Sequence, residues 1–215
     1  MTEATRLREQ IATLGKSMFD RGLTCGASGN ISARLGDGSV LVTPTGVTMG
    51  ALDPARISLL GPDMRHVSGD APTKEVPLHA AFYETRARTG AVVHLHSTHS
   101  VALSMLPETD PDCAIPPLTA YAVMRVGRVK LLPFFVPGDP AMGDAVRSLA
   151  GRRSAVLLAN HGPVVAGTDL EAAVNAMEEL EETAKLALLT RGMGAIGLNA
   201  AQIAAVVQKF DLDWD

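Results

Sequence analysis

The sequence predicts an α/β fold in which helices cover both faces of a central sheet, giving three α/β/α layers. Segments with apolar residues at helical spacing alternate with short, apolar, β-branched segments typical of strands. There is no regular strand–helix–strand repeat and no Gly-x-Gly-x-x-Gly motif, so we expect a mostly antiparallel or mixed sheet rather than a dinucleotide-binding fold. The 215 residues suffice for one sizeable core, and no linker divides them, which predicts a single domain over residues 1–215.

The expected elements follow from apolar spacing, capping residues and turns. An apolar stripe ending before Gly22 predicts a helix over about 3–21. Further helices are expected from Thr73, around 101–105, around 140–150, from Thr168 to Arg191, and after the capping pair Asn199 and Gln202. Strands are expected before the turn at 36–38, at 40–43, around 91–96, and at 130–135, 154–159 and 164–166. In the long helix, the pairs Glu178–Glu179 and Glu181–Glu182 are interpreted as its solvent-facing side.

Composition and charge exclude several classes of function. The net charge is −4 and no basic block is present, which argues against nucleic acid as a partner. The N-terminus lacks an apolar signal segment, and no apolar run approaches the ~20 residues of a membrane span, so we expect a cytoplasmic protein without membrane contact. Two cysteines are too few for a disulfide scaffold, and Cys25 has no assigned basic partner that would make it a nucleophile.

One predicted strand carries a candidate metal site. His94 and His96 lie two residues apart in the apolar run 91–98, and alternate side chains of a strand share a face. A pair of imidazoles can chelate a metal, but a catalytic site needs a further protein ligand. Without that ligand, two satisfied core histidines remain the alternative.

A third ligand has several candidates. His161 stands out because it follows the buried strand at 154–159 and is presented by a Gly-Pro turn. His66 lies in a polar loop and is expected to be solvated, and His99 is interpreted as a peripheral or surface residue. His79 lies four residues after Glu75, so the two can pair along a helix. Glu75 itself falls in the expected first helical turn, where complementing the helix dipole would explain it.

Five motifs together carry more information than any one of them. They are Ser28-Gly29-Asn30, Thr43-Pro44-Thr45-Gly46, Thr73-Lys74-Glu75, His94-Leu95-His96 and Asn160-His161-Gly162. In order and separation the chain resembles the class II aldolase/adducin-like family over nearly its whole length. Within the family it is most similar to members that decarboxylate 3-oxo-tetronate 4-phosphates, through motifs such as Val67-Ser68-Gly69-Asp70 and Pro137-Gly138-Asp139-Pro140. It is similar, more distantly, to the fuculose- and ribulose-phosphate aldolases.

The resemblance implies roles for individual residues. His94, His96 and His161 would bind a divalent metal, usually zinc, with manganese, cobalt or iron also compatible. Glu75 would be a fourth ligand in the empty site and would leave the metal to act as acid and base. The phosphate pocket would be lined by Gly29, Asn30, Thr45, Gly46 and Thr73. Lys74 stands where the aldolases have a hydroxyl residue and would face a second anionic group, and Tyr121 lies near the position of the aldolases' tyrosine acid.

The implied reaction is decarboxylation of a 3-oxo-tetronate 4-phosphate to dihydroxyacetone phosphate and CO2, through an enediolate that the metal stabilises. A sugar-phosphate aldolase is the alternative, because retro-aldol cleavage gives the same enediolate. A non-catalytic, adducin-like binding module is a third possibility, against which the intact set of metal-binding residues argues. The resemblance also implies a homotetramer with its sites between subunits, acting on a small phosphorylated sugar acid.

Overall fold

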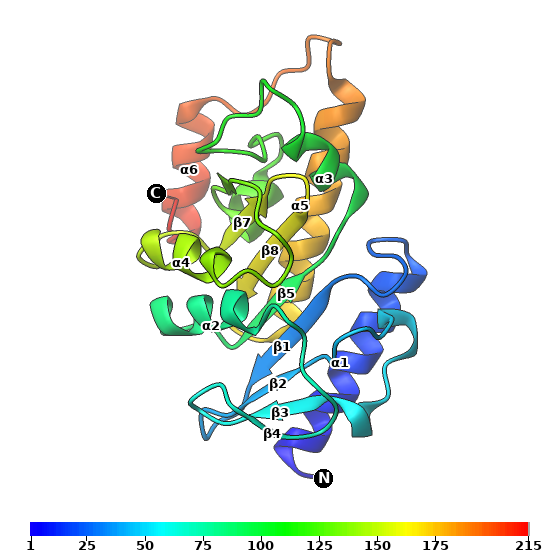
Figure 1. Cartoon of the computed structure of the whole chain (residues 1–215). Helices are drawn as coiled ribbons and strands as arrows, with labels where there is room; N and C mark the ends of the chain where they lie inside the picture. Colours follow the sequence, from blue (N-terminus) through cyan, green and yellow to red (C-terminus); the bar gives the residue numbers. More distant parts are fainter. Residues whose placement is uncertain (215) are drawn as a thin grey trace.

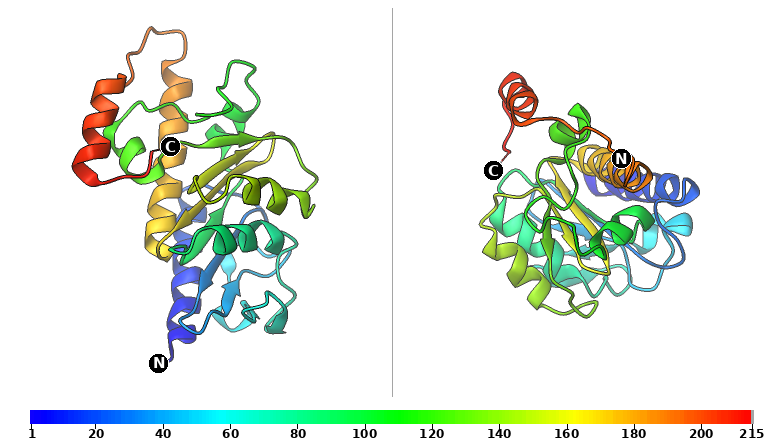
Figure 2. Two further views of the ribbon diagram at one scale, coloured as in Figure 1. Left: turned by 90° about the vertical axis from the view of Figure 1, so that its left-hand side faces the viewer. Right: turned by 90° about the horizontal axis from the view of Figure 1, so that it is seen from above.

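A computed structural model describes residues 1–214 as an eight-stranded sheet with helices on both faces (Figures 1 and 2). The strand order is β4-β3-β2-β1-β5-β8-β7-β6, and every neighbouring pair is antiparallel except β6 and β7. The predicted α/β class with a mixed central sheet is therefore confirmed. Strand β5 lies in the middle, between β1 and β8.

The strands are short. They are β1 (Asn30–Arg34), β2 (Val40–Val42), β3 (Ser58–Leu60), β4 (His66–Ser68), β5 (Ala91–His94), β6 (Lys130–Leu132), β7 (Ala155–Leu158) and β8 (Gly162–Gly167). The expected strands are present within a few residues. Strands β3 and β4 were not expected, and β4 is exposed along its length, so His66 is solvated as predicted but belongs to an edge strand.

The helices agree with the expected positions. They are α1 (Glu3–Asp20), α2 (Val76–Thr85), α3 (Thr98–Ser104), α4 (Ala141–Ser148), α5 (Leu170–Thr190) and α6 (Ala200–Phe210), with short 3-10 turns η1 (Met49–Ala51) and η2 (Pro54–Arg56) and a π-helical turn η3 (Ala122–Val126). Helix α5 is capped by Asp169, whose Oδ1 accepts from the Ala172 amide at 2.8 Å, and not by Thr168 as expected. No helix formed by residues 1–214 is long and apolar enough to cross a membrane.

Alternation along the central strand builds two cores. Ala91 and Val93 of β5 pack with residues of α1 and α5, whereas Val92 packs with residues of α2 and α4. Figure 2 shows helices on both faces of the sheet. Since His94 follows Val92 by two residues, the pleat turns it to the side of the sheet that α2 covers. This alternation brings the histidine pair next to the segment that opens α2.

Candidate metal centre

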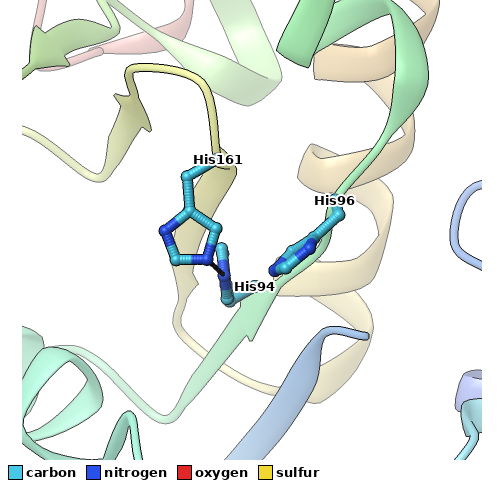
Figure 3. A group of neighbouring side chains, drawn as sticks. All are labelled: His94, His96 and His161. Carbon is cyan, nitrogen blue, oxygen red and sulfur yellow. Dashed lines mark hydrogen bonds between the residues drawn. The ribbon is translucent and has the colours of Figure 1, made fainter. Parts of the chain in front are cut away.

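Three histidines meet at the end of the central strands (Figure 3). His94 ends β5, His96 lies two residues beyond it, and His161 comes from the turn between β7 and β8. The ring centroids are 5.0 Å apart for His94 and His96, 4.9 Å for His94 and His161, and 4.6 Å for His96 and His161. One ligand atom from each ring lies within 4.8 Å of the others. The structure thus joins the histidine pair to the residue singled out as third ligand.

Glu75 adds a fourth potential metal ligand to the three histidines. Its Oε2 lies 3.4 Å from His94 Nε2, its Oε1 lies 3.4 Å from His161 Nε2, and the two Nε2 atoms are themselves 3.4 Å apart. Ligand atoms around a tetrahedral zinc ion with bonds of about 2.0–2.1 Å are separated by about 3.3–3.4 Å. The Oε1 atom is buried without a hydrogen-bond donor among the described residues. The spacing and the unpaired oxygen both fit a divalent cation.

Hydrogen bonding and burial prepare these groups for a metal. The Nδ1–H of His94 donates to the Pro163 carbonyl at 2.8 Å, which turns the Nε2 lone pair toward Glu75. Burial lowers the pKa of His94 to about 4 and lowers those of His96 and His161, so all three imidazoles are neutral near pH 7.

The Glu75 carboxyl responds to opposing influences. Burial alone raises its pKa, but His94, the hydrogen bond from Asn30 and then His161 lower it, and the net pKa lies below its ordinary value. Glu75 is therefore a carboxylate near pH 7. A carboxylate and neutral imidazoles are the protonation states that a metal requires of its ligands.

A cavity of about 290 Å³ opens beside this centre. It is lined by every residue predicted to bind substrate or phosphate, namely Gly29, Asn30, Thr45, Gly46, Thr73 and Lys74, together with Glu75, His96 and His161. Pro137 and Gly138 also line it, although sequence reasoning did not place them there. A Cβ built on Gly138 would lie 3.1 Å from Lys74 Cβ, so this loop packs directly against the lysine. Lys74 nevertheless remains exposed at the cavity.

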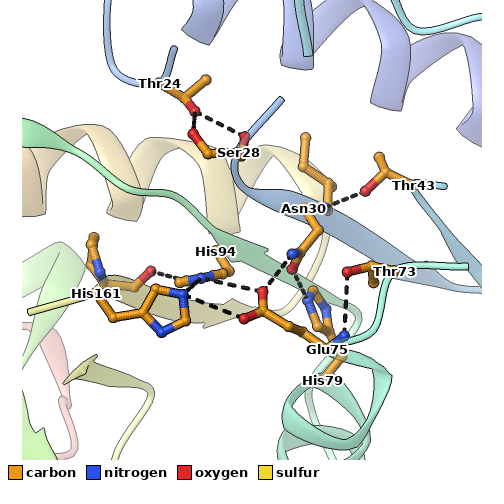
Figure 4. A network of polar contacts seen from close by, with 11 residues as sticks. Thr24, Ser28, Asn30, Thr43, Thr73, Glu75, His79, His94 and His161 are labelled. Atoms are coloured by element: carbon orange, nitrogen blue, oxygen red, sulfur yellow. Dashed lines mark hydrogen bonds and ion pairs between the residues drawn. The ribbon is translucent and has the colours of Figure 1, made fainter. Parts of the chain in front are cut away.

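Glu75 lies one residue before α2, not within its first turn. Its amide donates to Thr73 Oγ1 at 3.3 Å, so Thr73 turns the chain ahead of the helix without capping it. Glu75 and His79 do not pair through a direct hydrogen bond. Asn30 lies between the two and hydrogen-bonds to both (Figure 4).

Tyr121 lies apart from this cavity. Its side chain is 58% exposed, and it lines a separate hollow with Arg21, Arg125 and residues of α5. A single copy of the chain therefore does not bring Tyr121 to Glu75.

Glu181 was expected to face solvent, and that expectation is wrong. Its side chain is buried against the start of α3, where Oε1 accepts from the His99 amide at 2.8 Å and from His99 Nδ1 at 2.7 Å. The other oxygen, Oε2, accepts from the Ser100 amide at 3.0 Å and from Ser100 Oγ at 2.5 Å. The carboxylate thus caps the helix that begins two residues after His96. Local sequence gave no signal, since the partners are 81 and 82 residues away.

The chain is similar in sequence and fold to known proteins. Residues 9–188 match the family model described as Class II Aldolase and Adducin N-terminal domain. The chain is 48% identical over 198 residues to a 3-oxo-tetronate 4-phosphate decarboxylase of Escherichia coli K12, covering 92% of this chain and 93% of the relative. It is 31% identical over 212 residues to the L-fuculose phosphate aldolase of the same organism, covering 97% and 95%. The crystal structure of YgbL from Escherichia coli superposes with a TM-score of 0.93 at 45% identity, over 95% of this chain and 99% of that one.

Proposed function

Because the chain belongs to the class II aldolase and adducin family, we propose that it decarboxylates a 3-oxo-tetronate 4-phosphate to dihydroxyacetone phosphate and CO2. The observation that carries this proposal is a cavity beside the three histidines that combines Glu75, His96 and His161 with small polar residues and an exposed lysine ammonium. A substrate with a phosphate, a carboxylate and a keto group needs all three kinds of partner. The 48% identical relative carries the name of this activity.

In this proposal His94, His96 and His161 hold the cation, with Glu75 as a fourth donor until substrate binds. Zinc is the proposed ion, since imidazole and carboxylate donors at this spacing suit tetrahedral zinc, and manganese, cobalt or iron would also bind such ligands. When bound, a divalent cation supplies Lewis-acid polarisation of the substrate's keto oxygen.

Glu75 handles the proton. The bond between the carboxylate carbon and its neighbour breaks, CO2 leaves, and the electron pair stays with the remaining carbon framework. The carbon that keeps the electron pair takes up one proton from solvent, delivered by a water that the Glu75 carboxylate holds, or by Glu75 after solvent has protonated it, and this completes dihydroxyacetone phosphate. The burial of Glu75 beside the cavity supports this role.

The remaining cavity residues bind the two anionic groups. Backbone amides of glycine-rich turns and threonine hydroxyls suit a phosphate, which we assign to Gly29, Asn30, Thr45, Gly46 and Thr73. Lys74 is exposed at the same cavity. We assign it to binding of the substrate carboxylate, because an ammonium forms a charge-assisted hydrogen bond with a carboxylate.

We further propose a homotetramer in which Tyr121 reaches the site of a neighbouring copy as a proton donor. The exposure of Tyr121, away from its own chain's cavity, supports this assignment. Mixing inactive Glu75→Gln and Tyr121→Phe chains tests it, because hybrid assemblies contain some sites with both residues and should regain activity. If assemblies formed by refolding the two variants together contain both chains and stay inactive, the proposal is contradicted. A cytoplasmic location belongs to the same proposal, since phosphorylated metabolites are retained in that compartment.

A sugar-phosphate aldolase is the second candidate, favoured by the 31% identity to L-fuculose phosphate aldolase. The deciding experiment gives metal-loaded protein freshly generated 4-phospho-3-oxo-tetronate and follows CO2 and dihydroxyacetone phosphate together. A chelated sample and a ketose 1-phosphate run in parallel. Metal-dependent release of both products supports the decarboxylase. If only the sugar phosphate is cleaved, with release of an aldehyde, the aldolase is supported. If neither substrate yields a product, a binding module is favoured.

A further inference from the structure

A chain of hydrogen bonds leads from Glu75 into the core. Figure 4 shows its first three members, Glu75, Asn30 and His79. Asn30 Nδ2 lies 2.7 Å from Glu75 Oε2, and Asn30 Oδ1 lies 2.5 Å from His79 Nε2. His79 Nδ1 lies 2.7 Å from Ser32 Oγ, which lies 2.8 Å from the Tyr83 hydroxyl. All five side chains are buried, with at most 6% of any residue exposed.

The chemistry of the five groups fixes the direction of every bond. A carboxylate only accepts, so Asn30 must present its amide nitrogen to Glu75 and its carbonyl to His79. His79 must then carry its proton on Nε2, which leaves Nδ1 as an acceptor for the Ser32 hydroxyl. Because the hydroxyl hydrogen of Ser32 points to His79, Ser32 Oγ accepts a hydrogen bond from the Tyr83 hydroxyl. Every donor in the chain therefore points toward Glu75.

We propose that His79 is a positioning residue for Glu75, because it holds the Asn30 carboxamide in the orientation that donates to Glu75 Oε2 and so leaves Oε1 as the working oxygen. This inference rests on the proposed function, since it assigns the proton-handling atom of that reaction. Oε1 is the oxygen that has no donor among the described residues and lies 3.4 Å from His161 Nε2. Holding one oxygen of a carboxylate fixes the plane and direction of the other.

The opposite orientation of Asn30 shows what His79 prevents. A reversed carboxamide would turn its carbonyl toward the carboxylate, where two acceptors repel, and would leave Oε2 without a donor. A buried side chain without a donor at the His79 position would allow that reversal.

The first test uses the unchanged protein and no substrate. Nitrogen NMR of selectively labelled histidine, with and without zinc, reports which ring nitrogen of His79 carries the proton. The inference requires a neutral ring with the proton on Nε2 and an accepting Nδ1. A proton on Nδ1 overturns it, because Asn30 would then have to present its amide group to His79 and its carbonyl to Glu75.

The second test compares His79→Leu, which removes the donor, with His79→Gln, whose amide can still donate toward Asn30. Loss of an orienting partner in a metal site lowers activity or metal affinity by roughly 10- to 100-fold. We expect His79→Leu to lower kcat and zinc retention against a chelator by this factor with little change in KM, and His79→Gln to recover most of the loss. In an Asn30→Ala background, His79→Leu should cause no further loss, because His79 acts through Asn30.

Phe82→Leu is the matched control. Phe82 is fully buried on the same helix, outside the hydrogen-bonded chain, so this variant lowers stability while leaving kcat and zinc retention within about twofold. Equal losses in the control, or additive losses in the Asn30→Ala background, overturn the inference. Zinc retention and the NMR signal need no turnover, so they decide the inference even where the decarboxylase proposal fails.

Discussion

Replacing Glu181 by glutamine tests whether this buried carboxylate holds the start of α3, two residues after His96. A glutamine can accept with only one of its two end atoms, so at least one of the amides of His99 and Ser100 loses its acceptor. An unsatisfied buried donor costs about 1–3 kcal/mol, and removing a negative charge from a helix N-terminus costs roughly 0.3–1 kcal/mol more. Together these effects amount to about 3 kcal/mol.

For a chain of this length, 3 kcal/mol corresponds to a fall in Tm of about 6–12 °C. Thermal unfolding followed by circular dichroism, at equal zinc content, measures it. Glu182→Gln is the control, since Glu182 is exposed next to Glu181 and its ion pair with Lys185 is a surface contact worth about 0–1 kcal/mol. A Tm of Glu181→Gln within about 2 °C of the Tm of the control, well short of the expected fall, would show that the carboxylate does not hold α3 and would refute the reasoning.

The remaining predictions concern the metal centre and the cavity. His96→Ala should abolish activity and zinc retention while leaving the far-ultraviolet circular dichroism unchanged, and retained zinc with full activity would contradict the ligand assignment. Acid should destabilise the metal-free protein: because burial lowers the pKa of His94 to about 4 and that of His79 to about 3, the unfolded chain binds more protons below its ordinary histidine pKa of about 6.5. The urea midpoint of chelated protein should therefore fall steadily from pH 6.5 toward pH 4, and a flat midpoint would count against this explanation. Lys74→Met should raise KM for the 3-oxo acid roughly 10-fold or more through loss of a charge-assisted contact, with unchanged zinc retention, and an unchanged KM would remove Lys74 from substrate binding.

Sequence periodicity predicted those features in which the residues concerned lie on one helix or one strand. The two-residue spacing of His94 and His96 was enough to place both imidazoles together, and the Gly-Pro turn after His161 indicated the third. The long helices followed from apolar spacing in the same way, whereas the mixed sheet was inferred from the absence of a regular strand–helix–strand repeat. Helices and the pair on one strand depend on residues that are neighbours along the chain.

Features that depend on tertiary contacts were missed or misread. His79 was read as a helical neighbour of Glu75, although its partners Asn30 and Ser32 are 49 and 47 residues away. Glu181 was read as solvated, because nothing in α5 indicates that α3 covers it. Strands β3 and β4 are too short, and β4 too exposed, to show an alternating pattern. Tyr121 stays a prediction, since a single copy does not bring it to the cavity.

The central position of β5 has a consequence for the order in which the centre assembles. The groups that meet there come from residues 30, 75, 94–96 and 161, and the pairing of β1 and β8 with β5 brings residues 30 and 161 to the histidine pair. Such pairings join distant parts of the chain and form slowly. Before they form, His94 and His96 can offer a metal two donors at most. With the proposed ligands Glu75, His94, His96 and His161, tight binding of a divalent cation is then a late event in folding, and an ion held by all four side chains reports that the middle of the sheet is complete.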